Sequence, residues 1–99
     1  MPLSFESQIV DNVAVIRCKG RITLGPEANA LEEEVQRQTR IPGTDVYRVK
    51  RVVLQMSDTD FLDSCGLGSL VRIYGILHSA GGGLKLCEIR RPMRIRMKS

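Results

Sequence analysis

The order in which strand-like and helix-like patterns follow one another most strongly constrains the fold of this chain. Two apolar segments, residues 5–9 and 13–18, come first and are joined by a turn-forming Asp-Asn pair. A helical pattern, a short apolar run over residues 52–56, a second helical pattern and a last strand over residues 84–89 follow. Strands separated by helices pair in parallel through right-handed crossovers. This β-β-α-β-α-β order therefore predicts an α/β fold, with a mixed β-sheet and helices mainly on one face.

Both helical patterns have recognisable ends. The first begins at Pro26, which suits the first turn of a helix, and stops at a Pro-Gly pair; the second begins near Ser64 and stops at glycines 81–83. Residues 57–60, before the second helix, are predicted to be a loop. In the first helix the predicted core stripe is Ala28, Leu31 and Val35, with Glu32, Glu33, Glu34 and Arg37 facing outward. In the second helix the predicted core face is Leu67, Leu70, Val71, Tyr74 and Leu77.

Length and composition limit the class of protein. A chain of 99 residues is expected to form one domain. It contains no apolar run of bilayer-spanning length and no signal-peptide pattern over its first eleven residues, so we expect a cytoplasmic protein without a membrane partner. Three widely spaced cysteines do not suggest a disulfide framework. Cys18 and Cys87 lie in apolar contexts and are predicted to be buried thiols.

The charge and the reactive side chains indicate a binding protein. The net charge of +4 has a local origin in the basic residues near the end of the chain, which are Arg90, Arg91, Arg94, Arg96 and Lys98. Aromatic residues make up only 4%, which offers no stacking platform for single strands, so we expect no direct nucleic-acid partner. The one histidine, His78, is far in sequence from Cys65, and zinc, phosphate-loop and dinucleotide motifs are absent. We expect no catalytic residue, no metal and no cofactor.

One segment, Asp63-Ser64-Cys65-Gly66-Leu67-Gly68, is more informative than the rest because a strand leads into a loop there and the loop leads into a helix start. Asp63 or Ser64 can cap that helix by accepting hydrogen bonds from its free N–H groups. Gly66 and Gly68 cost helix stability, which indicates that access to the backbone matters there. On these residues alone, an N-cap with tightly packed glycines is the simpler interpretation. A helix start that binds a partner or carries a phosphate is the alternative.

This segment closely resembles the D-S-S-G-L-G motif of STAS domains in bacterial anti-sigma-factor antagonists. Gly20-Arg21-Ile22 is similar to the G-x-[LI] turn of that family, and residues 82–87 are similar to its G-G-x-L-x-L strand. The resemblance covers nearly the whole chain, so residues 1–99 are expected to form a single STAS domain. It also implies a final helix, opened by Pro92 and cut short after Met97.

The resemblance implies a partner-switching protein rather than an enzyme. In that family, an anti-sigma factor serine kinase phosphorylates the second residue of the S-S pair. The unphosphorylated antagonist binds the kinase and releases a sigma factor, and a phosphatase resets the system. The matching acceptor position here is Cys65, with Ser64 beside it. The implied partner-binding residues are Thr23, Asp63, Ser64, Cys65, Gly66, Leu67 and Gly68.

The sequence departs from the family pattern at three positions. Cys65 stands at the acceptor position, so either Ser64 substitutes for it or the protein is not phosphorylated. Thr23 stands where the family turn commonly has an aspartate, and Gln55 replaces a frequent aspartate in the preceding strand. The alternative function is a STAS scaffold or transporter-associated regulatory module without phosphoswitching. A thiol enzyme using Cys65 would need a base that the sequence does not show, and a homodimer remains open.

Overall fold

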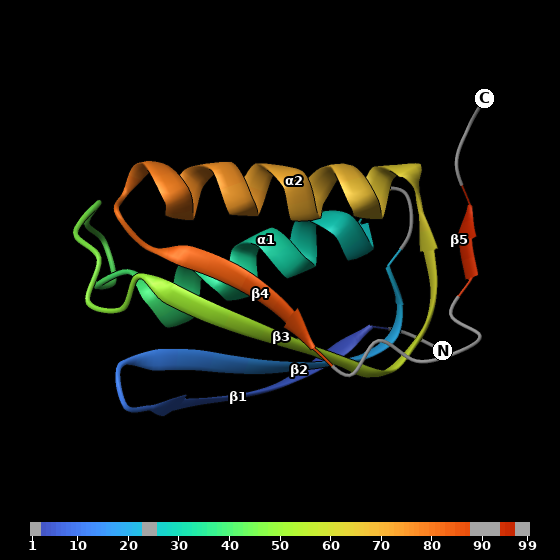
Figure 1. The fold of residues 1–99 in the computed structure, drawn as a ribbon, viewed down its shortest axis with the longest axis horizontal. Coiled ribbons are helices and arrows are strands. Elements are labelled where there is room, and N and C mark those ends of the chain that lie inside the picture. The colour runs from blue at the N-terminus through green and yellow to red at the C-terminus, as the bar shows by residue number, and fades with distance from the viewer. Residues whose placement is uncertain (1–2, 23–25, 88–93, 97–99) are drawn as a thin grey trace.

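The computed structural model describes residues 3–22, 26–87 and 94–96. Its elements alternate as the sequence predicts and add one short strand at the end (Figure 1). They are β1 (Ser4–Val10), β2 (Val13–Ile22), α1 (Pro26–Thr39), β3 (Arg51–Asp63), α2 (Ser64–Ser79), β4 (Gly83–Cys87) and β5 (Arg94–Arg96). None of the helices in these residues is long and apolar enough to span a bilayer.

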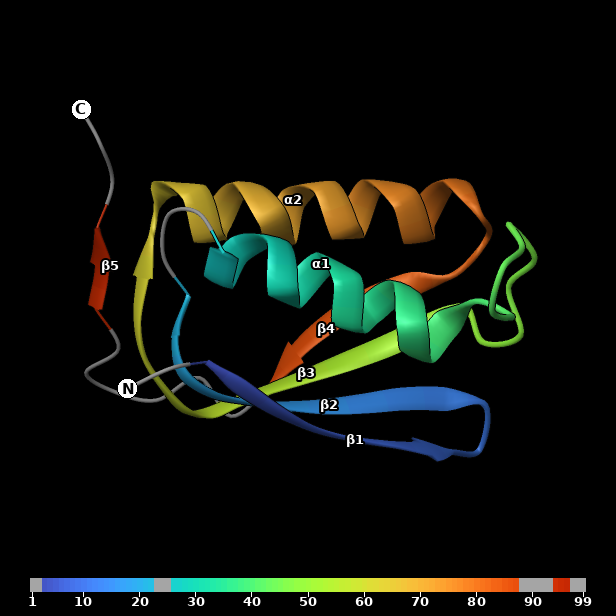
Figure 2. The same cartoon turned by 180° about the vertical axis from the view of Figure 1, so that it is seen from behind.

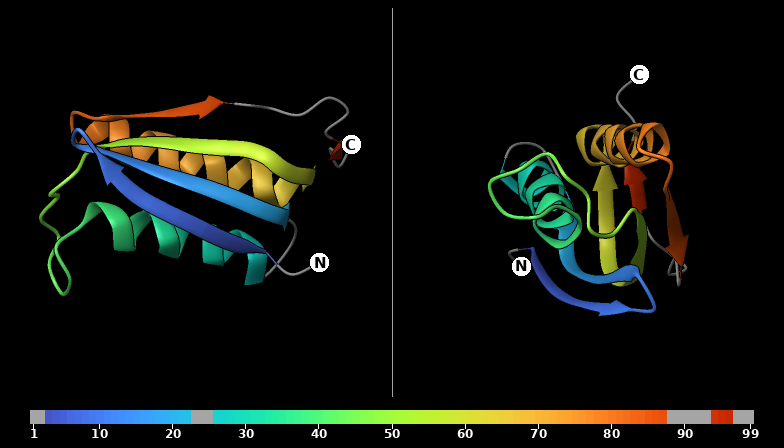
Figure 3. Two further views of the ribbon diagram at one scale, coloured as in Figure 1. Left: turned by 90° about the horizontal axis from the view of Figure 1, so that it is seen from below. Right: turned by 90° about the vertical axis from the view of Figure 1, so that its left-hand side faces the viewer.

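The sheet is mixed, as predicted. Its strand order is β1-β2-β3-β4; β1 and β2 are antiparallel, and β2–β3 and β3–β4 are parallel. Figures 1 and 2 show α1 and α2 together on one face, and Figure 3 shows the sheet curving around them. The β1–β2 hairpin turns through Asp11 and Asn12, which both have positive φ, as a two-residue hairpin loop that follows the twist of its strands requires.

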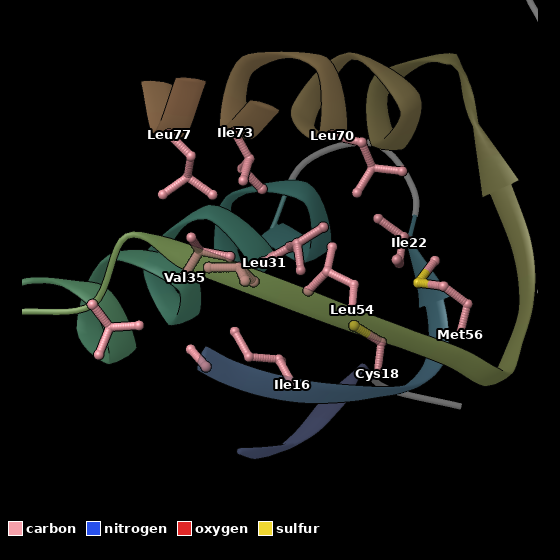
Figure 4. Close-up of a cluster of buried hydrophobic side chains, with 13 residues drawn as sticks. Ile16, Cys18, Ile22, Leu31, Val35, Leu54, Met56, Leu70, Ile73 and Leu77 are labelled. Atoms are coloured by element: carbon pink, nitrogen blue, oxygen red, sulfur yellow. The ribbon is translucent and has the colours of Figure 1, made fainter. Parts of the chain in front are cut away.

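The core lies between the sheet and the two helices (Figure 4). Side chains alternate along β2, so Ile16 and Cys18 point toward the helices while Arg17 between them points away. The predicted stripe of α1 is buried, because Ala28, Leu31 and Val35 are all largely inaccessible. Burial raises the pKa of the Cys18 thiol to about 12, and the nearby charge of Glu34 adds to the effect. Cys87, which was also predicted to be buried, is only half-buried.

The prediction of a loop over residues 57–60 was wrong, because β3 continues to Asp63. The extension pairs in parallel with the last part of β2, up to Ile22 opposite Leu62, after two register shifts. Thr59 is fully buried, and its hydroxyl donates a hydrogen bond of 3.1 Å to the carbonyl of Cys18. Residues 57–60 are polar and carry no strand pattern of their own. Their strand conformation depends on contacts with β2, which is far away in the sequence, so local patterns do not predict it.

Two predicted helix faces also need correction. In α2 the buried residues are Gly66, Ser69, Leu70, Ile73 and Leu77, whereas Val71 and Tyr74 are 64% and 51% exposed. The buried face is rotated because α2 packs against α1 as well as against the sheet.

In α1, Glu34 was predicted to face solvent but is only 7% exposed. Its carboxylate accepts hydrogen bonds from the Ser7 hydroxyl at 2.6 Å, from the Gln38 amide at 3.0 Å and from Arg37. These partners compensate the cost of burying a carboxylate where α1 crosses β1.

The predicted final helix falls mostly on residues outside the described ones. Within the described part, Arg94–Arg96 is a strand that pairs in parallel with the last residues of β3. This strand replaces part of the helix that Pro92 was predicted to open.

Candidate functional site

The candidate site is the junction at which β3 becomes α2 without an intervening loop. Asp63 is both the last residue of the strand and the N-cap of the helix, with an extended backbone. Its Oδ1 accepts a hydrogen bond of 2.9 Å from the backbone N–H of Gly66. Of the two candidate caps, Asp63 therefore takes this role. The capping carboxylate also places negative charge at the positive end of the helix dipole.

The motif residues are brought together on the first turns of α2. Ser64 and Cys65 are its first two residues, and both are partly exposed, as are Leu67 and Gly68. Gly66 is buried beneath them. Thr23 lies outside the described residues, although β2 ends beside this junction because Ile22 pairs with Leu62.

Gly68 is not required for close packing. A Cβ atom built there would lie 3.9 Å from Nη1 of Arg72, which is an ordinary van der Waals distance. The tight-packing interpretation of this glycine therefore has no support at position 68.

An ion pair that the sequence did not indicate ties the site to α1. Arg72 donates from Nε to Oε1 of Glu32 at 2.9 Å and from Nη2 to Oε2 at 3.1 Å. The hydrogen bond from Arg72 lowers the pKa of Glu32, and the same bond raises the pKa of Arg72. Ser69 is buried between them, and its hydroxyl lies 3.3 Å from Nη2 of Arg72. The helix that carries the motif is thus fixed to its neighbour on one side.

The opposite side of α2 is largely apolar and exposed along its later turns, whereas Ser64 and Leu67 are half-buried and Leu67 also packs against the core. We call the residues Ser64, Leu67, Val71, Tyr74 and His78 the α2 flank. Val71 and Tyr74 are well exposed, and the Tyr74 ring stacks on His78 with centroids 5.6 Å apart. The residues recur at intervals of three and four, so they form one line along the helix. Of the three flank residues that were predicted to face the core, Leu67 does pack against it, whereas Val71 and Tyr74 are exposed. Helical periodicity alone does not fix which face of α2 meets the sheet.

His78, the one histidine of the chain, lies too far from Cys65 to act as its base. His78 follows Cys65 by thirteen residues on the same helix, which corresponds to about 20 Å along the axis. The described residues also contain no group of three or more side chains suited to hold a metal ion. The junction therefore presents a capped helix start and an apolar flank, which are features of a binding surface.

Comparison with known proteins identifies the family. The chain matches the STAS domain family over residues 4–99 and belongs to it. Membership makes it a regulatory binding protein rather than an enzyme. It is 24% identical over 96 residues to an anti-sigma F factor antagonist from Paenibacillus polymyxa, a match that covers 94% of this chain and 74% of the relative.

Two solved structures share the fold. One is a proposed anti-sigma factor antagonist from Thermotoga maritima, with a TM-score of 0.69, 22% identity, and coverage of 96% of this chain and 86% of the other. The second is an antisigma-factor antagonist STAS domain from Rhodobacter sphaeroides, with a TM-score of 0.62, 14% identity, and coverage of 94% and 97%.

Removing the cap is expected to weaken the site. Asp63→Ala takes away the acceptor for the Gly66 N–H and should lower the free energy of unfolding by about 1 kcal/mol. Asp63→Asn keeps an acceptor oxygen and should lower it by much less. Urea denaturation followed by circular dichroism measures both variants, and equal losses would show that the cap is not the stabilising contact.

Proposed function

We propose that this protein is a cytoplasmic anti-sigma factor antagonist that binds an anti-sigma factor serine kinase and so releases a sigma factor. The observation that carries the proposal is the motif at residues 63–68, placed on an accessible helix start. The relative from Paenibacillus polymyxa, named an anti-sigma F factor antagonist, supports it. The proposed contact surface is the first two turns of α2, with Ser64, Cys65, Leu67 and Gly68 accessible to a partner.

Ser64 is the proposed phosphoacceptor. It is the first residue of α2, where free backbone N–H groups and the helix dipole favour added negative charge. Successive helix residues are separated by about 100° around the axis, so Ser64 and Cys65 point in different directions. Ser64 belongs to the open α2 flank, whereas Cys65 lies in line with Ser69 and Arg72, on the side that faces α1. A phosphate on Ser64 would add charge to the apolar contact surface, and a phosphatase would restore it.

A second candidate function follows from the cysteine at the family's acceptor position. In this alternative Ser64 is not modified and no anti-sigma kinase is bound, and the domain is a scaffold or a transporter-associated regulatory module that acts without phosphoswitching. Cys65 at the second position of α2 favours this alternative.

Intact-mass analysis after incubation with a cognate anti-sigma kinase, ATP and magnesium tests the proposal. We expect one added phosphate on the wild type and on Cys65→Ala, none on Ser64→Ala, and loss of kinase binding once the phosphate is present. A pull-down with the same kinase is run in parallel. Binding without phosphate would indicate a constitutive antagonist. If the protein neither binds the kinase nor gains a phosphate, the scaffold or transporter module becomes the better assignment.

A further inference from the structure

Within the described residues, the two helices leave the β4 edge of the sheet partly uncovered. In the described part of the chain two helices lie over four sheet strands, with α1 toward β1 and β2 and α2 toward β3 and β4 (Figure 3). Leu86 of β4 is the register partner of Leu54 and therefore points to the same side of the sheet. Leu54 is fully buried, but Leu86 is 37% exposed. The apolar α2 flank and Leu86 thus lie along the same open side of the domain.

The α2 flank has the spacing of a helix–helix contact surface. Its intervals of three, four, three and four residues give the 3.5-residue average that lets two helices pack side chains into each other's gaps. Gly68 and Gly75 border this line, and a Cβ atom at Gly75 would meet nothing within 4 Å. A second helix can therefore approach α2 closely without meeting a long side chain at these positions.

We propose that the α2 flank is a symmetric dimer interface, in which two copies of this chain pair their α2 helices antiparallel around Val71. Val71 is the central residue of the flank, so a two-fold axis there places it against its own copy. Leu67 then lies opposite Tyr74 of the second copy, and Ser64 lies opposite His78. The α2 flank can pair with its own copy because the intervals between its residues are nearly the same in both directions along the helix.

The distribution of charge also favours a second copy as the occupant. The flank itself carries no lysine, arginine or carboxylate, and Arg72, the only arginine of α2, is bound to Glu32 on the α1 side. Antiparallel pairing brings the capping carboxylate of Asp63 beside His78, which lies in the last helical turn of the other copy. It also sets each helix dipole against an opposing one. The contact is therefore free of like-charge repulsion and complementary at both ends.

The contact should be weak and reversible. A helix of sixteen residues is about 24 Å long, so one helix pair with its neighbouring strand edge buries less than the roughly 800 Å² per partner of a stable complex. Because Ser64 lies in the line of contact, each copy covers the other's proposed phosphoacceptor. Dimerisation and kinase binding then compete. This competition rests on the proposed function, whereas the dimer itself does not.

Sedimentation velocity on the purified protein alone, from about 10 µM to about 1 mM, tests the dimer. We expect the wild type to shift from monomer toward dimer as concentration rises and Val71→Arg to remain monomeric. Val46→Arg is the matched control, because Val46 is 57% exposed in the segment between α1 and β3, away from the flank. A wild type that stays monomeric throughout, or a Val71→Arg variant that dimerises like the control, would overturn the proposal.

Disulfide trapping tests the symmetry independently of any change in charge. In a Cys65→Ser, Cys87→Ser background, Val71→Cys should form a linked dimer under mild oxidation, since two copies meeting at this residue bring its Cα atoms within disulfide range. Val46→Cys should not. Equal crosslinking of the two variants would contradict a two-fold axis at Val71. If the wild type is monomeric while Val71→Arg loses kinase binding, the flank is a kinase-binding surface and the proposed dimer interface is wrong.

Discussion

Replacing Gly82 with alanine is expected to lower the free energy of unfolding by about 3 kcal/mol, the upper end of what overpacking costs. A Cβ atom at this position would lie 1.8 Å from the carbonyl oxygen of Lys50 and 2.6 Å from its carbonyl carbon. Both are backbone atoms, so no side-chain rotation relieves the clash. The connection between α2 and β4 would have to move away from the chain that leads into β3.

That connection is held at two points, which is why the movement is costly. Gly82 donates its N–H to the carbonyl of Leu77 at 2.8 Å, and Gly83 donates to the carbonyl of Lys50 at 3.1 Å. Gly83→Ala is the matched control, because a Cβ atom on the neighbouring glycine meets nothing within 4 Å. Urea denaturation should show a large loss for the first variant and a small one for the second. A Gly82→Ala variant as stable as Gly83→Ala would contradict the close approach.

Leu54→Ala is expected to lower the free energy of unfolding by about 3 kcal/mol, through lost burial and the cavity left behind. Leu54 is fully buried in the central strand, between the sheet and the helices (Figure 4). A small domain of this kind has a total stability of about 5–15 kcal/mol, so the variant should lose a large fraction of it.

Its register partner Leu86 provides the control for that loss. The two leucines face the same side of the sheet, but Leu86 lies at the open edge and is 37% exposed. Leu86→Ala should therefore cost less than about 1 kcal/mol. Thermal and urea denaturation of both variants measure the difference, and similar losses would show that the β4 edge is covered in solution.

The order of the elements was predictable because each depends on local patterns. The alternation in β1, the β-branched run of β2 and the ends of both helices can all be read over short windows. The motif at residues 63–68 was also placed correctly at a helix start, with Asp63 as one of two candidate caps. Capping involves residues three apart in sequence, and such contacts leave a local signal.

The features that were missed depend on contacts between distant segments. The second half of β3 is polar, and its pairing with β2 joins residues about forty positions apart, such as Thr59 and Cys18. Glu34 is buried only because β1 supplies Ser7 as a partner. The direction in which Val71 and Tyr74 point was set by the packing of α2 against α1, which helical periodicity alone does not fix.

The proposed function requires that the protein displaces a sigma factor from an anti-sigma factor kinase through the start of α2. The most direct measurement is to titrate the protein into a preformed complex of the cognate kinase with a fluorescently labelled sigma factor, loaded with nucleotide, and to follow anisotropy. We expect the anisotropy to fall to the value of free sigma factor near stoichiometric addition. Ser64→Glu, which adds negative charge at the first residue of α2, should abolish this release, and Val46→Glu should leave it unchanged. Unchanged anisotropy at every concentration of the wild type would contradict the proposed function.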